Sequence, residues 1–108
     1  MMLYYLDDEI LLCEMFKEFM EDENIKVRVF TDSQLAINAC EELEPDLIFI
    51  DYRLGGATGD KVALRMKSTI AKILVTGELN FPDVKGFDLI ISKPYQLKKM
   101  KNIVNGYC

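Results

Sequence analysis

The chain has 108 residues and a net charge of −5, and half of its residues are hydrophobic. This length suits one domain with a substantial core, and the acidic balance argues against a general nucleic-acid binder. The sequence contains no histidine, which excludes histidine-based catalysis and histidine-ligated zinc.

The cysteines indicate a reducing environment. The chain has three cysteines, Cys13, Cys40 and Cys108, which is an odd number, and none of them lies in a CxxC motif. A disulfide framework is therefore not expected. The first two lie in apolar helical stretches and are expected to be inert core thiols. No apolar run approaches the length of a membrane span, and no signal peptide is apparent. We therefore expect a cytoplasmic protein.

The first half of the chain alternates between strand and helix patterns. Short apolar or alternating runs predict strands over residues 2–6, 26–30 and 46–50, and longer periodic stretches predict helices over residues 9–22 and 31–44. The strand over residues 46–50 is apolar nearly throughout, as expected of a central parallel strand. The first helix carries one apolar stripe, which comprises Ile10, Leu11, Leu12, Met15, Phe16, Phe19 and Met20.

The second half repeats this alternation more weakly. It predicts a short helix over residues 60–67, strands over residues 70–75 and 87–91, and a final helix over residues 95–105. Residues 78–86 are a poor helix sequence, so the helix between the fourth and fifth strands is expected to be short or absent. Five such units predict an α/β fold with a doubly wound parallel sheet and right-handed crossovers.

Polar residues follow four of the five predicted strands. Asp7 and Asp8 follow the first strand, Asp51 the third, Thr76 the fourth and Lys93 the fifth. In open α/β sheets, ligands bind at the carboxyl ends of the strands. Three acids, a hydroxyl and a lysine at one edge could hold a divalent cation and a phosphoryl group.

These residues occur in the order and with the neighbours typical of one family. The matching segments are Asp7-Asp8-Glu9, the loop from Asp51 to Gly59, Thr76-Gly77 and Lys93-Pro94. Over essentially its whole length, residues 1–108, the chain resembles a receiver domain of two-component response regulators. The resemblance implies a flavodoxin-like sheet of order 2-1-3-4-5 and a cis peptide bond before Pro94.

The resemblance also implies a role for each strand-end residue. Asp51 would accept the phosphoryl group, because a carboxylate can attack phosphorus to give an acyl phosphate. Thr76 would hydrogen-bond a phosphoryl oxygen, and Lys93 would pair with the same group. The oxygen ligands of a Mg²⁺ ion would be the carboxylates of Asp7, Asp8 and Asp51 and the backbone carbonyl of Arg53.

The function implied is a signalling switch. A sensor histidine kinase or phosphotransfer protein would donate the phosphoryl group, and the domain would catalyse only its own phosphorylation and dephosphorylation. The output partner is not identified by the sequence, and a homodimer is one option. Direct nucleic-acid binding and membrane association are not expected. The alternative is a receiver-shaped protein-interaction module that works without phosphorylation.

An enzyme of the haloacid-dehalogenase type would also order Asp, Thr and Lys along an α/β sheet. That family needs a second acid two residues after its nucleophile, where this chain has Arg53. It also needs acids after the lysine, and residues 94–108 contain none. The phosphatase interpretation is therefore disfavoured.

Some positions depart from the family pattern. Ile90 occupies the place of a frequent switch aromatic, so we expect signalling to use loop movement around residues 77–86. Tyr95 is expected to be a packing residue. Arg53 and Glu78 could form an ion pair that covers the phosphoryl group, or could be two exposed side chains that contribute little.

Overall fold

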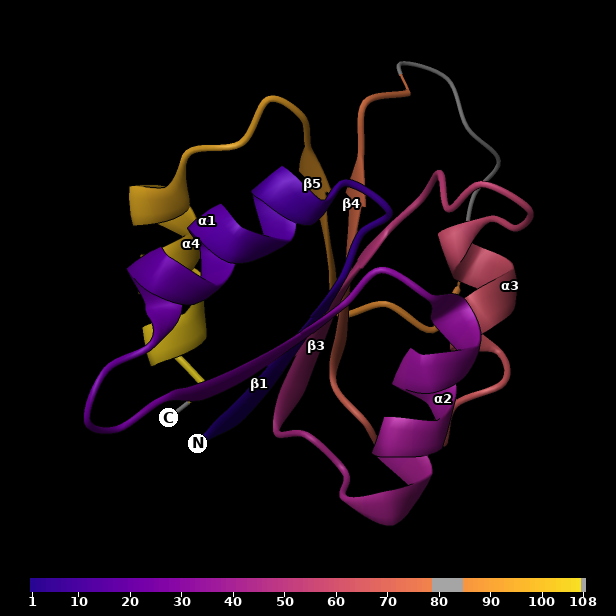
Figure 1. Cartoon of the computed structure of the whole chain (residues 1–108), viewed down its shortest axis with the longest axis horizontal. Helices are drawn as coiled ribbons and strands as arrows, with labels where there is room; N and C mark the ends of the chain where they lie inside the picture. Colours follow the sequence, from indigo (N-terminus) through magenta and orange to yellow (C-terminus); the bar gives the residue numbers. More distant parts are fainter. Residues whose placement is uncertain (79–84, 108) are drawn as a thin grey trace.

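The structure is a computed structural model, and it describes residues 1–78 and 85–107. Its helices and strands alternate along the chain as the sequence predicts (Figure 1). In chain order they are β1 (Met2–Leu6), α1 (Ile10–Met20), β2 (Lys26–Phe30), α2 (Ser33–Glu42), β3 (Leu47–Asp51), α3 (Gly59–Ala63), β4 (Lys72–Thr76), β5 (Leu89–Ser92) and α4 (Leu97–Asn105).

The five strands form one parallel sheet in the order β2-β1-β3-β4-β5, which confirms the predicted order. Its three inner strands are apolar almost throughout and buried on both faces, as parallel strands covered by helices must be. The register places Leu6 opposite Ile50, and Asp51 opposite Val75. The strands therefore end at nearly the same level, and the residues that follow them meet at one edge.

The sheet separates two hydrophobic layers. Helices α1 and α4 cover one face, and α2 and α3 cover the other (Figure 1). Neighbouring residues of a strand point to opposite faces, so the consecutive tyrosines of β1 belong to different layers. Tyr4 packs in the core beside α2, and Tyr5 packs in the core beside α1 and α4. Both side chains are fully buried.

The link between β4 and β5 is described only in part. The predicted short or absent helix falls within residues 78–86, and residues 79–84 of that segment lie outside the described part of the chain. The described residues on either side, Gly77, Glu78 and 85–88, carry no helix. The predicted loop movement concerns the same segment and stays a prediction.

Helix α1 buries a narrower face than its apolar stripe predicts. Cys13, Phe16 and Met20 are its buried residues. By contrast, Leu11 is 70% exposed and Met15 is 53% exposed. A helix on one face of a sheet buries only the residues at spacings of three and four that face it, so part of this apolar stripe stays outside the core. The remaining apolar side chains of α1 form part of the molecular surface.

The described cysteines behave as predicted. Cys13 and Cys40 are both free and buried, and burial raises the pKa of each thiol to about 11. They therefore stay protonated at neutral pH and act as small apolar side chains. Within residues 1–78 and 85–107, no helix has the length and apolar character needed to cross a membrane.

Candidate functional site

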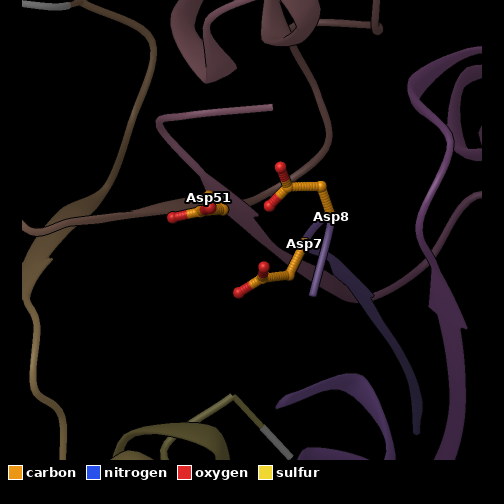
Figure 2. A group of neighbouring side chains, drawn as sticks. All are labelled: Asp7, Asp8 and Asp51. Carbon is orange, nitrogen blue, oxygen red and sulfur yellow. The ribbon is translucent and has the colours of Figure 1, made fainter. Parts of the chain in front are cut away.

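Three carboxyl groups gather at the carboxyl ends of β1 and β3. Asp7 and Asp8 directly follow β1, and Asp51 is the last residue of β3. One oxygen from each of the three lies within 4.8 Å of the others. Figure 2 shows the three groups extending to the same side. Asp7 and Asp51 are buried, whereas Asp8 is exposed.

Lys93 bridges two of these acids. It follows β5, whose pairing with β4 extends to a backbone hydrogen bond from the N–H of Lys93 to the carbonyl of Thr76. Its Nζ lies 3.1 Å from Oδ1 of Asp51 and 3.2 Å from Oδ2 of Asp7. The Lys93–Pro94 peptide is cis, as the resemblance implies. The parallel sheet thus brings residues more than 80 positions apart into one ion-paired group.

Burial and like charge make Asp51 hard to ionise. Burial, followed by the negative charge of Asp7, raises the pKa of Asp51 from 3.8 to about 6, although Lys93 opposes the shift. Burial works against the ammonium of Lys93, but Asp51 and Asp7 outweigh it, so the pKa of Lys93 is raised. Among the described residues, one ammonium therefore faces three carboxyl groups, and the site retains a negative charge.

Thr76 ends β4 beside this group. Its side chain is buried, and its hydroxyl oxygen accepts a hydrogen bond of 3.0 Å from the backbone N–H of Glu78. That bond uses a lone pair and leaves the O–H proton free to serve a donor role. Position and chemistry both suit contact with an anion bound at the strand ends.

Arg53 and Glu78 form the ion pair that the sequence suggested as one option. Nε of Arg53 lies 2.6 Å from Oε1 of Glu78, joining the loops that follow β3 and β4. The Arg53 side chain is 72% exposed. The backbone of Arg53 pairs with that of Thr58 in an isolated antiparallel bridge. The use of the Arg53 carbonyl as a cation ligand stays a prediction.

Gly59 begins α3 and lies against the backbone at the end of β3. Its N–H donates to the carbonyl of Tyr52 at 2.7 Å, where the loop turns into α3. A Cβ at this position would collide with the backbone carbonyl oxygen of Asp51. Glycine is therefore required for the close approach of α3 to the end of β3.

Two tyrosines that the sequence did not assign to the site also reach it. The Tyr5 hydroxyl donates to Oδ2 of Asp7 at 2.6 Å, and it lies 3.0 Å from the Tyr95 hydroxyl. Burial, and then the hydrogen bond to Asp7, raise the pKa of Tyr5, so its hydroxyl stays protonated. A usable signal was present, because Tyr5 lies two residues before Asp7, and alternate residues along a strand point to the same side.

The donor set fits a hard divalent cation. Carboxylate oxygens are the preferred ligands of Mg²⁺, and the three acids offer oxygens close enough to share one ion. The excess of negative charge would be relieved by such an ion, which would also lower the pKa of Asp51. Asp7, Asp8 and Asp51 are the side chains that could hold it.

Comparison with known proteins agrees with this geometry. The family model described as response regulator receiver domain matches residues 4–105. The chain is 31% identical over 102 residues to the DNA-binding response regulator MtrA of Mycolicibacterium paratuberculosis, and 30% identical to that of Mycolicibacterium smegmatis. Each match covers 88% of this chain but 45% of the relative, so the chain spans less than half the length of these proteins.

Solved structures share the fold. A CheY-like response regulator receiver domain from Methylobacillus flagellatus superposes with a TM-score of 0.85 at 21% identity, covering 99% of this chain and 98% of that one. The receiver domain of Francisella response regulator 1452 gives a TM-score of 0.85 at 21% identity, covering 98% and 94%. The family model matches residues 4–105, and the MtrA relative is 31% identical over 102 residues. The chain therefore belongs to the response regulator receiver domains of two-component systems.

Proposed function

We propose that residues 1–108 form one receiver domain that accepts a phosphoryl group on Asp51 and works as a phosphorylation-dependent switch. The observation that carries the proposal is the group of three carboxyl oxygens within 4.8 Å, two of whose acids share Lys93. A structural role alone gives no reason to bury two acids beside each other at a strand end.

Asp51 acts as the nucleophile. Its carboxylate oxygen attacks phosphorus, a P–O bond forms, and the bond from phosphorus to the donor breaks, so the donor leaves with the bonding electrons. Burial and Asp7 raise the pKa of Asp51, and a bound cation would lower it again and so favour the nucleophilic carboxylate. Lys93 then pairs with the transferred group, and the O–H of Thr76 donates to one of its oxygens.

Asp7, Asp8 and Asp51 would hold the cation, and the Arg53 carbonyl would add a further oxygen. When bound, Mg²⁺ neutralises the charge that develops on the phosphoryl oxygens. The chain itself supplies the nucleophile, the positioning groups and the cation ligands. It therefore catalyses only its own phosphorylation and dephosphorylation.

The donor is a sensor histidine kinase or a phosphotransfer protein in the cytoplasm. Apolar side chains of α1 support a protein partner at this end of the molecule. Leu12 and Met15 of α1 line an open groove of about 540 Å³ together with Lys93, Tyr95 and Leu97. A partner seated there would lie next to the Lys93–Asp51 pair.

The phosphorylated domain passes on its signal by binding a second partner. The relatives are named DNA-binding regulators, but this chain corresponds to less than half of their length. Its charge of −5 favours a protein partner over direct contact with nucleic acid. Leu89 and Ile90 on β5 are 41% and 40% exposed, which offers a surface for that partner or for a second copy.

Intact mass after incubation with acetyl phosphate and Mg²⁺ tests the proposal. We expect one added phosphoryl group, absent when Mg²⁺ is removed and absent in Asp51→Asn. The variant retains the side-chain volume but lacks the nucleophile, which makes it the matched control. A folded wild-type protein that is never modified and does not bind beryllofluoride would favour the phosphorylation-independent interaction module instead.

A further inference from the structure

Two tyrosine hydroxyls connect the groove lined by Leu12, Met15 and Leu97 to the Asp7 carboxylate. The Tyr95 ring lines the groove, and its hydroxyl lies 3.0 Å from the Tyr5 hydroxyl. Tyr5 gives its single proton to Asp7 at 2.6 Å. The Tyr5 oxygen must therefore accept the proton of Tyr95, which gives the hydroxyl chain the direction Tyr95 to Tyr5 to Asp7.

Packing fixes the Tyr5 hydroxyl in place. The ring is fully buried and stacks on Phe16 of α1, with centroids 4.3 Å apart and planes 12° apart. Phe16 in turn meets Phe49 of β3 edge to face at 5.3 Å. A fully buried ring that stacks on Phe16 in this way cannot swing its hydroxyl away from Asp7 without disrupting the core.

Asp7 has two other donors, and they differ in kind. The backbone N–H of Glu9 donates to Oδ1 at 2.9 Å, and Lys93 donates to Oδ2 at 3.2 Å. Lys93 also serves Asp51, and in the proposed function it pairs with the phosphoryl group. Tyr5 also donates to Oδ2, and among the described contacts it donates to no other acid.

The geometry points to Tyr5 as a positioning residue that orients Asp7 for the divalent cation, with Tyr95 holding the Tyr5 hydroxyl. This inference rests on the proposed function, because it requires that Asp7 binds a cation. Oδ2 already accepts from Tyr5 and Lys93, so Oδ1 is the oxygen that keeps an unused lone pair among the described contacts. Partners of a ligand that fix its orientation in this way commonly tune metal affinity.

The test is a Mg²⁺ titration at constant neutral pH, followed by the amide shifts of the residues around Asp7 and Asp51. In Tyr5→Phe we expect about tenfold weaker binding, the lower end of the range for such partners because Asp7 keeps two donors. In Tyr95→Phe we expect about twofold weaker binding, because only the polarisation of the Tyr5–Asp7 bond is reduced.

Tyr4→Phe is the matched control. Tyr4 precedes Tyr5, is equally buried, and donates its hydroxyl proton to the carbonyl of Leu43 at 2.8 Å. This variant loses a partly buried hydrogen bond on the opposite face of the sheet, so it should lower thermal stability as Tyr5→Phe does. Its Mg²⁺ affinity should equal that of the wild type, which separates positioning from general destabilisation.

The outcomes separate this inference from the proposed function. Wild-type protein that binds no Mg²⁺ would overturn both. Equal or tighter binding by Tyr5→Phe, with normal binding by the wild type, would overturn the positioning role alone. So would an equal loss of affinity in Tyr4→Phe. If Tyr5→Phe does not fold, Tyr95→Phe decides the question, because Tyr95 lies outside the fully buried core, and an unchanged affinity there would reject the hydroxyl chain.

Discussion

The two ends of the parallel sheet each hold a lysine with low exposure, and they use it differently. Lys72 begins β4 at the amino end and is 3% exposed. Its Nζ donates to the backbone carbonyls of Lys67 at 2.7 Å and Ile70 at 3.0 Å. Lys93 follows β5 at the carboxyl end and pairs with Asp7 and Asp51.

Lys72 therefore has a structural role, whereas Lys93 belongs to the charged group proposed to carry out the chemistry. At the amino end, burial lowers the pKa of Lys72, and two neutral carbonyl groups accept hydrogen bonds from its ammonium. At the carboxyl end, carboxylates outnumber the ammonium, so the group carries a net negative charge that a further cation would relieve. Changes at the amino end should therefore alter stability alone, whereas changes at the carboxyl end should alter cation binding and phosphorylation.

The largest effect is expected from Gly59→Ala at the carboxyl end. The new Cβ would collide with the Asp51 carbonyl, so either α3 or the end of β3 must move. We expect a loss of roughly 3 kcal/mol in the free energy of unfolding and weaker Mg²⁺ binding. Urea denaturation and a Mg²⁺ titration measure the two. Gly56→Ala is the control, because a Cβ there meets nothing within 4 Å; equal losses in both variants would contradict the account.

Asp51→Asn should stabilise the cation-free protein at neutral pH. The folded-state pKa of Asp51 is raised from 3.8 to about 6, so the protonated acid favours folding. Its contribution is fully present below pH 3.8 and is lost as pH rises through about 6. The variant should therefore be more stable than wild type at neutral pH by about 3 kcal/mol.

Urea denaturation with a chelator, in acid and at neutral pH, measures this difference. Wild type and variant should converge as pH falls below 3.8, where Asp51 is protonated in both folded and unfolded chains. Added Mg²⁺ should narrow the gap at neutral pH, because it neutralises the carboxylate in the wild type. A gap independent of pH would show that Asp51 is not the titrating group.

Lys72→Met tests the amino end. Methionine keeps an apolar stem but leaves two carbonyls without their donor, so we expect a loss of about 1–2 kcal/mol in the free energy of unfolding. Mg²⁺ affinity and phosphorylation by acetyl phosphate should not change. Lys93→Met is the matched change at the carboxyl end and should slow phosphorylation sharply. Similar phosphorylation rates in Lys72→Met and Lys93→Met would show that the two lysines do not differ in role.

The smallest effect on stability is expected from Arg53→Ala and Glu78→Ala. Their ion pair is largely exposed, so the unfolding midpoint should not shift measurably. If the pair shields the phosphoryl group from water, both variants should lose phosphate faster than wild type, as followed by mass over time. Equal rates of loss would leave the pair as two surface side chains.

Sequence periodicity was sufficient for the strands, because apolar runs such as Leu47–Asp51 are typical of the centre of a covered sheet. The strand-end residues Asp7, Asp51 and Lys93 followed from the same logic. The strand order, by contrast, came from the family resemblance. Burial on α1 does not follow from periodicity alone, since Leu11 and Met15 carry the helical period yet are exposed. Apolar periodicity does not specify how wide a face the neighbouring elements will cover.

Side-chain hydrogen bonds were the other limit. Tyr95 was expected only to pack, but its hydroxyl meets that of Tyr5 across a separation of 90 residues. The position of Gly59 against the Asp51 carbonyl was hidden for the same reason. Such contacts depend on the relative placement of elements, which local sequence patterns do not determine.

Locating the phosphoryl group tests the central claim most directly. Borohydride reduces an aspartyl phosphate to homoserine, and peptide mapping then identifies the modified residue. After treatment with acetyl phosphate, we predict homoserine at Asp51 in the presence of Mg²⁺ and intact aspartate in its absence. Modification at Asp7 or Asp8, or modification of Asp51 that does not depend on the cation, would contradict the account of the carboxyl end as a cation-dependent phosphoryl acceptor.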